Sequence, residues 1–145
     1  MDRVRRMIGC DSREVIPYTG KGIYVGVLDS GVASHPDLRG RIAAFKDFTS
    51  DKRTYYDDNG HGTHVCGIAC GSGKLSGGRY KGIAPGAKIL VGKVLDYNGN
   101  GSVFHMIDGI DWVIKNNRDR YDRTVMRAYE SLFINTEQRK QIFGF

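Results

Sequence analysis

The stretch Val25-Gly26-Val27-Leu28-Asp29-Ser30-Gly31 decides the fold of this chain, because an unbroken apolar run ends on a carboxylate and a glycine turn. Apolar residues without alternation are typical of a strand buried on both faces of a parallel sheet, so we expect a strand over 22–28. Asp29 then follows at the carboxyl end of that strand, where ligands bind in open α/β sheets. Asp-Ser-Gly is also a good turn in its own right, so this stretch alone leaves a structural role for Asp29 open.

A second stretch, Asn59-Gly60-His61-Gly62-Thr63-His64-Val65-Cys66-Gly67, places an imidazole between two glycines. The residues from His61 to about Cys70 are small and apolar with hardly a charge, which predicts a helix that is buried all round. Another apolar run predicts a second buried parallel strand over 87–95, and strand, helix and strand form a β-α-β unit. A short strand is expected over 41–48, and the polar residues 49–59 are interpreted as a surface loop.

The clearest amphipathic helix is expected from Val103 to about Asn117, with Ser102 as its N-cap. Its polar positions Asp108, Asp111 and Lys115 are predicted to face solvent. Its apolar positions recur at spacings of three and four and are predicted to face away from solvent: Val103, Met106, Ile107, Ile110, Val113 and Ile114.

Together the first two stretches resemble the aspartate and histidine boxes of the subtilases, the subtilisin-like serine peptidases. The resemblance covers about Val15 to Tyr121 and includes Gly82-Ile83-Ala84-Pro85-Gly86-Ala87 and Lys93-Val94-Leu95-Asp96. It implies an α/β fold: a partial doubly wound parallel sheet of the subtilisin type, in three αβα layers, whose C-terminal half is missing. It also implies a division into a peptidase-like part over 1–122 and a divergent tail over 123–145 that is helical or poorly ordered.

The resemblance assigns chemistry to individual residues. A hydroxyl is a poor nucleophile at neutral pH, so a base must take its proton, and His61 matches that base. A carboxylate must hold the other ring nitrogen in the right tautomer, and Asp29 matches that carboxylate. The segment that resembles the family's substrate-pairing strand supplies the expected substrate-binding residues: Gly99, Asn100, Gly101, Ser102 and Val103.

The nucleophile that this chemistry needs is not in the sequence. No Gly-Thr-Ser-Met-Ala-like turn and no oxyanion asparagine segment occur between Met1 and Phe145. None of the serines present combines a sharp turn with neighbouring N–H donors. We therefore expect a subtilisin-like serine endopeptidase in an incomplete form that is inactive alone. The alternatives are a non-catalytic peptide-binding pseudoenzyme and a fragment completed by another chain.

Composition and charge bear on partners. The expected partner is a peptide or protein substrate, with association through an exposed sheet edge as a further expectation. The net charge of +6 comes from scattered basic residues, so a nucleic-acid binder is the less favoured class. The apolar runs fall far short of the roughly 18 residues needed to span a membrane. No secretory signal precedes the fold, so the chain as written is expected in the cytoplasm, with secretion as the alternative if the N-terminus is incomplete.

Cysteines and histidines bear on cofactors. Cys10, Cys66 and Cys70 are odd in number and are expected to be free thiols. His61 and His64 are three residues apart without an intervening glutamate, which does not match a zinc helix. Asp37 matches a family position that can help to hold calcium, but the glycine-rich, basic segment after Cys70 offers no partner oxygens. The sequence therefore predicts no cofactor and no metal, while the family resemblance leaves calcium open as an alternative.

Overall fold

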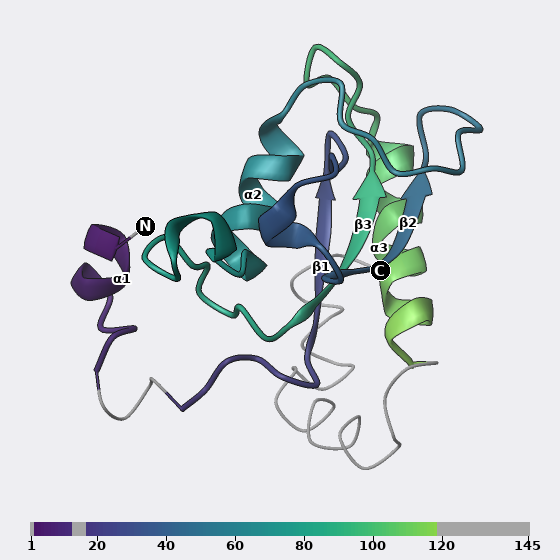
Figure 1. The fold of residues 1–145 in the computed structure, drawn as a ribbon. Coiled ribbons are helices and arrows are strands. Elements are labelled where there is room, and N and C mark those ends of the chain that lie inside the picture. The colour runs from purple at the N-terminus through teal and green to yellow at the C-terminus, as the bar shows by residue number, and fades with distance from the viewer. Residues whose placement is uncertain (1, 13–16, 119–145) are drawn as a thin grey trace. The chain divides into compact units, whose positions relative to one another are not determined.

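The computed structural model describes residues 2–12 and 17–118, so the expected tail over 123–145 lies outside the described residues. Its elements in chain order are α1 (Asp2–Met7), β1 (Tyr24–Asp29), the 3-10 helix η1 (Pro36–Leu38), β2 (Ile42–Asp47), α2 (His61–Cys70), the 3-10 helix η2 (Lys74–Ser76), β3 (Lys88–Lys93) and α3 (Val103–Arg118) (Figure 1). The chain divides into two compact units, Met1–Val113 and Ile114–Phe145. All packing discussed below lies within the first unit.

The sheet has three parallel strands in the order β1-β3-β2, with β3 in the centre (Figure 1). β3 follows the predicted pattern, since every residue after Lys88 is buried. β1 does not, because Gly26 is exposed and Tyr24, Val25 and Leu28 are only half-buried, although Val27 is buried. The prediction that β1 is covered on both faces is wrong because β1 lies at the edge of the described sheet, where no further strand shields it.

α2 packs on one face of the sheet. Cys66 and Cys70 are fully buried against alternate residues of the strands, as the two-residue period of a strand requires. His61, His64 and Ile68 remain exposed, so the prediction of a helix buried all round is wrong. A short helix on a three-stranded sheet has only one side to bury. The core on this face consists of Val27, Val32, Leu38, Cys66, Cys70, Ala87, Ile89 and Val91.

α3 contacts the intervening positions of the strands. A Cβ on Gly109 would lie 2.9 Å from Val94 Cγ1 and 3.0 Å from Leu28 Cδ2, so this glycine lets the helix approach the sheet closely. Val113 lies against Gly26 in the same way. The predicted N-cap is present, because the Ser102 hydroxyl accepts the backbone N–H of His105 at 3.1 Å.

The orientation of α3 differs from the prediction. Its apolar positions Val103, Met106, Ile107 and Ile110 are exposed, whereas Gly109 is buried. The helix thus rests on the sheet through a glycine, and most of the apolar stripe that defined it in the sequence is left uncovered. Hydropathy alone could not find the contact side, because glycine contributes almost nothing to an apolar pattern while permitting the closest backbone approach.

The remaining expectations concern cysteines and membranes. Cys10, Cys66 and Cys70 are free, as predicted. Burial raises the pKa of the Cys66 thiol to about 12, with neighbouring Cys70 adding to the effect. Within the described ranges, none of the helices combines the length and apolar character that crossing a bilayer demands.

Candidate functional site

The carboxyl end of β1 and the first residue of α2 meet at a carboxylate and an imidazole. His61 Nδ1 lies 2.8 Å from Asp29 Oδ1 and 2.9 Å from Asp29 Oδ2. The Asp29 side chain is 12 % exposed, whereas the His61 side chain is 62 % exposed. A shielded carboxylate therefore holds one edge of a ring whose remainder faces solvent.

This contact sets the protonation pattern of the ring. A carboxylate accepts hydrogen bonds, so Nδ1 must carry the proton that it donates to Asp29. The neutral ring then leaves the lone pair on Nε2, which is the atom of a general base. No described residue makes a hydrogen bond with Nε2. The arrangement can orient a base and stabilise the imidazolium that forms when the base takes a proton.

Two glycines allow the backbone after β1 to lie against the start of α2. A Cβ on Gly62 would clash with the backbone carbonyl oxygen of Gly31, and a Cβ on Gly31 would clash with that of Tyr56. Gly31 also has a φ of +124°, which side-chain-bearing residues rarely adopt. Of the two glycines that flank His61, only Gly62 is required by close packing, because a Cβ on Gly60 would meet nothing within 4 Å.

Asp57 fixes the segment that carries His61. Its carboxylate accepts the hydroxyls of Ser30, at 2.9 Å, and of Thr63. It also accepts the backbone N–H groups of Asn59, Gly60 and Thr63 at 3.2, 2.8 and 2.9 Å. Burial alone would raise the pKa of Asp57, but hydrogen bonds from Thr63, Gly60 and Ser30 outweigh it and hold that pKa far below its usual range. A carboxylate at the start of a helix is also favoured by the helix dipole.

Ser30 connects this segment to the Asp29 turn. Its backbone N–H donates to Asp29 Oδ1 at 2.7 Å, and its hydroxyl accepts the backbone N–H of Gly62 at 2.9 Å. The same hydroxyl donates to Asp57, as described above. Ser30 is fully buried and both capacities of its hydroxyl are used, so it is a structural link between Asp29 and α2.

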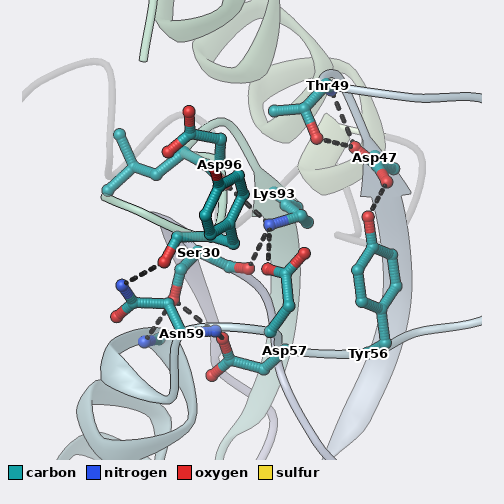
Figure 2. A network of polar contacts seen from close by, with 12 residues as sticks. Ser30, Asp47, Thr49, Tyr56, Asp57, Asn59, Lys93 and Asp96 are labelled. Atoms are coloured by element: carbon teal, nitrogen blue, oxygen red, sulfur yellow. Dashed lines mark hydrogen bonds and ion pairs between the residues drawn. The ribbon is translucent and has the colours of Figure 1, made fainter. Parts of the chain in front are cut away.

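Lys93, the last residue of β3, connects the segments that follow β1 and β3 at the same end of the sheet with the loop before α2. Figure 2 shows its ammonium group among oxygen acceptors beside Ser30 and Tyr56. The residue is 1 % exposed, and Nζ donates to Ser30 O at 2.9 Å, Leu95 O at 2.7 Å and Asp58 Oδ1 at 2.7 Å. A buried charge is tolerated only when it is paired and hydrogen-bonded, and these contacts meet both conditions.

Tyr56 extends the network to β2. Its ring lies 5.2 Å from Lys93 Nζ, and its hydroxyl donates to Asp47 Oδ2 at 2.7 Å (Figure 2). Burial would raise the pKa of Asp47, but hydrogen bonds from Ser50, Tyr56 and Thr49 outweigh it and lower the pKa to about 2. The polar segment 49–59, predicted as a surface loop, is therefore anchored at one end by the buried carboxylate of Asp47 and near the other by the half-buried carboxylate of Asp57.

The expected substrate-binding segment forms a turn beside this network. Gly101 makes an isolated antiparallel bridge with Leu95, and Asn100 uses both of its backbone groups on Asp96. Asn59 Nδ2 donates to Tyr97 O at 2.9 Å and so links the turn to the His61 segment. The residues of the expected segment are all exposed: Gly99, Asn100, Gly101, Ser102 and Val103.

Asp37, the residue that matches a calcium position of the family, joins η1 to the segment after α2. Asp37 Oδ1 accepts the backbone N–H of Leu75 at 2.9 Å, and its carbonyl oxygen accepts that of Ser72 at 2.9 Å. Across residues 2–12 and 17–118, no group of three or more His, Cys, Asp or Glu residues is placed to hold a metal ion.

A pocket of about 360 Å³ lies beside η1, away from Asp29 and His61. It supplies none of the residues of the Asp29–His61 network. Its lining consists of Ser34, His35, Pro36, Leu38, Arg39, Gly40, Ile42, Tyr55 and Lys74.

Sequence reasoning missed the residues that hold the pair in place. Asp57 was grouped with the polar loop, and no capping signal marked it, because the N-cap of α2 is Gly60. Lys93 was treated as part of a strand, although a lone lysine closing an apolar strand is a signal for a buried ion pair. Ser30 gives no such signal, because a serine in a turn is unremarkable.

The chain is similar in sequence to known subtilases. The model of the family described as the "Subtilase family" matches residues 20–122. Serine protease AprX of Bacillus subtilis (strain 168) is 46 % identical over 107 residues, which cover 74 % of this chain and 24 % of AprX. Subtilisin E of the same organism is 42 % identical over 103 residues, covering 70 % of this chain and 26 % of subtilisin E.

A solved structure is similar as well. The crystal structure of a cold adapted subtilisin-like serine proteinase matches with a TM-score of 0.60 and 36 % sequence identity, and covers 69 % of this chain and 34 % of that protein. The match confirms the predicted fold class, a partial α/β fold of the subtilisin type. The chain spans about a quarter of the length of the two curated relatives described above.

Proposed function

Because the chain belongs to the subtilase family, we propose that Asp29 and His61 are the carboxylate and the base of a serine-peptidase triad whose nucleophile this sequence does not carry. The observation that carries the proposal is the paired contact of His61 Nδ1 with both oxygens of Asp29, at 2.8 and 2.9 Å. In the proposed reaction, Nε2 accepts the proton of a serine hydroxyl as it attacks a peptide carbonyl, and Asp29 stabilises the resulting imidazolium.

The proposed substrates are peptides or proteins. We assign their binding to the exposed segment Gly99, Asn100, Gly101, Ser102 and Val103, with extended peptide backbone pairing beside the turn. Both backbone groups of Asn100 make hydrogen bonds with Asp96. The proposed pairing with peptide backbone is therefore assigned to the residues on either side of Asn100. The contact from Asn59 to Tyr97 would hold the segment at a fixed position relative to His61.

The chain on its own is proposed to be inactive. For subtilisin itself, loss of the serine lowers kcat by about 10⁶, and the residual 10³ to 10⁴ over water comes from the oxyanion hole and binding. The sequence from Met1 to Phe145 carries no segment that resembles either the serine box or the oxyanion asparagine. Among the described serines, Ser30 and Ser102 already use their hydroxyls in the network and in the α3 cap.

Two measurements test the proposal. The purified chain, incubated with fluorogenic peptides, is expected to release no fluorophore above buffer. Cleavage that persists through purification and disappears in Asp29→Ala would contradict the assignment of inactivity. Nitrogen NMR of His61 tests the pair directly, because we expect the Nδ1–H tautomer in the natural chain and a mixture in Asp29→Ala.

A matched control makes the NMR result specific. Asp51 is an exposed carboxylate on the loop before α2, and Asp51→Ala is expected to leave the His61 tautomer unchanged. If the tautomer is the same in the natural chain and in Asp29→Ala, Asp29 does not orient the ring and the proposed pair is wrong.

The exposed 99–103 segment also supports a second candidate, a peptide-binding protein without catalysis. The two candidates differ in what added catalytic residues would do. A pseudoenzyme binds peptide with micromolar or weaker affinity in the isolated chain and gains nothing from a serine supplied by another polypeptide. Isothermal titration of the chain with unlabelled substrate peptides, before and after such addition, separates them.

A further inference from the structure

The pocket beside η1, which we call the η1 pocket, is lined by three segments that lie far apart in the sequence. Its lining includes residues within 34–42, Tyr55 from the loop before α2 and Lys74 from the start of η2. Its volume of about 360 Å³ lies within the range of sites that hold small molecules, roughly 300 to 1,000 Å³. Neither Asp29 nor His61 belongs to the lining. The η1 pocket is therefore a candidate site for a separate small ligand.

The charged groups that line the η1 pocket are positive. Arg39 contributes a guanidinium group and Lys74 an ammonium group, and no Asp or Glu is among the lining residues. Among the described residues, no ion pair involves either of these cations. Lys88, at the start of β3, adds a third ammonium group nearby, because its Nζ donates to the carbonyl oxygen of the lining residue Gly40. A cleft lined by one sign of charge concentrates ions of the opposite sign, so the η1 pocket favours an anion.

His35 adds a neutral donor to the same lining. Its Nδ1 accepts the backbone N–H of Asp37 at 3.2 Å, so the neutral ring carries its proton on Nε2. Ser34 and Tyr55 bring hydroxyl groups. The oxygens of a phosphate or carboxylate accept several hydrogen bonds, and the planar guanidinium of Arg39 matches two of those oxygens at once. The lining therefore holds the donors that an oxyanion needs.

Backbone hydrogen bonds hold Lys74 beside η1. Asp37 O accepts the backbone N–H of Ser72, and Asp37 Oδ1 accepts that of Leu75, both at 2.9 Å. These contacts flank Lys74 in the sequence and fasten its segment to the 3-10 helix that precedes Arg39. The two cations are thus carried by backbone segments that are hydrogen-bonded to each other. Such an arrangement lowers the entropy lost when a ligand binds between them.

The rest of the lining is largely apolar. Pro36 and Leu38 come from η1, Ile42 begins β2, and Tyr55 is 46 % exposed. Leu38 is only 2 % exposed and belongs to the core, so its position is fixed by packing. Apolar and aromatic side chains around a few polar groups are typical of sites for small organic molecules. A bare inorganic ion or an uncharged hydrocarbon would each use only one kind of lining group.

We propose that the η1 pocket binds a small organic anion, in which a phosphate or carboxylate group is joined to an apolar body such as an aromatic ring. Arg39 and Lys74 bind the anionic group, and His35 Nε2–H is a further donor to it. The apolar body packs against Leu38 and the ring of Tyr55. The site binds its ligand without reacting with it, and it is independent of the Asp29–His61 pair.

The experiment titrates the full chain with phenyl phosphate and, separately, with benzoate. The backbone amides of Arg39, Gly40 and Lys74 are followed by NMR, and the two probes distinguish phosphate from carboxylate as the anionic group. We expect a dissociation constant of about 1 mM or lower for at least one probe. Inorganic phosphate lacks the apolar body and phenol lacks the full charge, so each is expected to bind at least about tenfold more weakly than phenyl phosphate.

Three substitutions and one control locate the ligand. Arg39→Gln and Lys74→Gln are each expected to weaken binding at least about fivefold, because each removes a charged donor. Tyr55→Ala is expected to weaken binding of phenyl phosphate and to leave that of inorganic phosphate unchanged. All three residues are exposed, so circular dichroism is expected to show the natural fold. Lys21→Gln removes the same charge at an exposed lysine outside the lining and is expected to change binding less than about twofold.

The outcomes decide between a built site and general attraction to a basic surface. Binding that both Arg39→Gln and Lys74→Gln weaken, and that Lys21→Gln does not, supports the proposal. Amides that do not shift with either probe at about 10 mM, or shifts that persist in both variants, would overturn it. Phenol or inorganic phosphate binding as tightly as phenyl phosphate would contradict the proposed ligand class. None of these results depends on the His61 tautomer, so this proposal and the proposed function can fail separately.

Discussion

The carboxyl end of the sheet and the exposed apolar side of α3 differ in how fully the described residues cover them. We call this side of α3 the apolar flank, and it consists of Val103, Met106, Ile107 and Ile110. At the sheet end, Ser30, Asp57 and Lys93 satisfy one another, and no buried side-chain polar atom lacks a partner there among the described residues. At the apolar flank, Ile107 and Ile110 are about half exposed. The difference teaches that the described residues satisfy the polar groups around His61 among themselves, whereas they leave the apolar flank exposed.

Asp57→Ala is expected to have the largest effect on that comparison, because it removes an acceptor from five hydrogen bonds at the sheet end. Several donors would be left without a partner, and we expect the free energy of unfolding to fall by about 3 to 4 kcal/mol. Urea unfolding followed by circular dichroism measures the loss. The control Asp51→Ala, at an exposed carboxylate, is expected to stay within about 0.5 kcal/mol. Equal losses in the two variants would mean that the hydrogen bonds of Asp57 do not stabilise the carboxyl end of the sheet.

Lys93→Met is expected to have the next largest effect. It leaves the carbonyl oxygens of Ser30 and Leu95 without their donor, while Asp58, whose side chain is 39 % exposed, regains water. We expect a loss of about 2 kcal/mol in the same unfolding experiment. Lys88→Met at the exposed start of the same strand is the control, and a loss there of the same size would exclude a special role for Lys93.

Acid is expected to weaken the sheet end through Asp47. The pKa of Asp47 is about 2 in the folded chain against an ordinary value of 3.8, so its contribution is complete above about pH 4 and is lost as pH falls through the folded pKa. The difference corresponds to about 2 kcal/mol. Unfolding measured from pH 5 to pH 2 is expected to show this decline, and Asp47→Asn should show a shallower one. An identical slope in the variant would assign the decline to other carboxyl groups, such as Asp57.

Ile110→Lys is expected to have the smallest effect, because an exposed residue of the apolar flank contributes little to the stability of the chain alone. We expect a change within about 0.5 kcal/mol. The neighbouring substitution Gly109→Val supplies the contrast, since its side chain would meet Val94 and Leu28 and is expected to cost about 1 to 3 kcal/mol. Thermal unfolding of both variants makes the comparison within one turn of helix. A large loss in Ile110→Lys would mean that the flank is packed by the chain itself.

The sequence was sufficient for the elements that local patterns define. Two apolar runs predicted β1 and β3, the short strand expected over 41–48 matches β2, and Ser102 predicted the start of α3. It also sufficed to bring Asp29 and His61 together, through the resemblance of two short boxes. Each of these features depends on residues close together in the chain or on a motif that is specific in itself.

Long-range packing explains what sequence reasoning could not supply. The edge position of β1 follows from strand order, which no local pattern encodes. The contact side of α3 depends on Gly109, whose value lies in the absence of a side chain. The role of Asp57 depends on donors from Ser30 and Thr63, which come from different elements. Burial of such a carboxylate is favourable only once all its partners are in place.

The order of the strands has a consequence for folding during synthesis on the ribosome. The central strand β3 is the last of the three described strands to be synthesised, and its pairing joins Tyr24 to Lys88, 64 residues later in the chain. During synthesis both outer strands would leave the ribosome with no neighbour of their own, and neither can form its ladder until residues 88–93 emerge. Contacts so distant in sequence slow folding. We therefore expect the edges of β1 and β2 to stay unpaired until β3 has been synthesised.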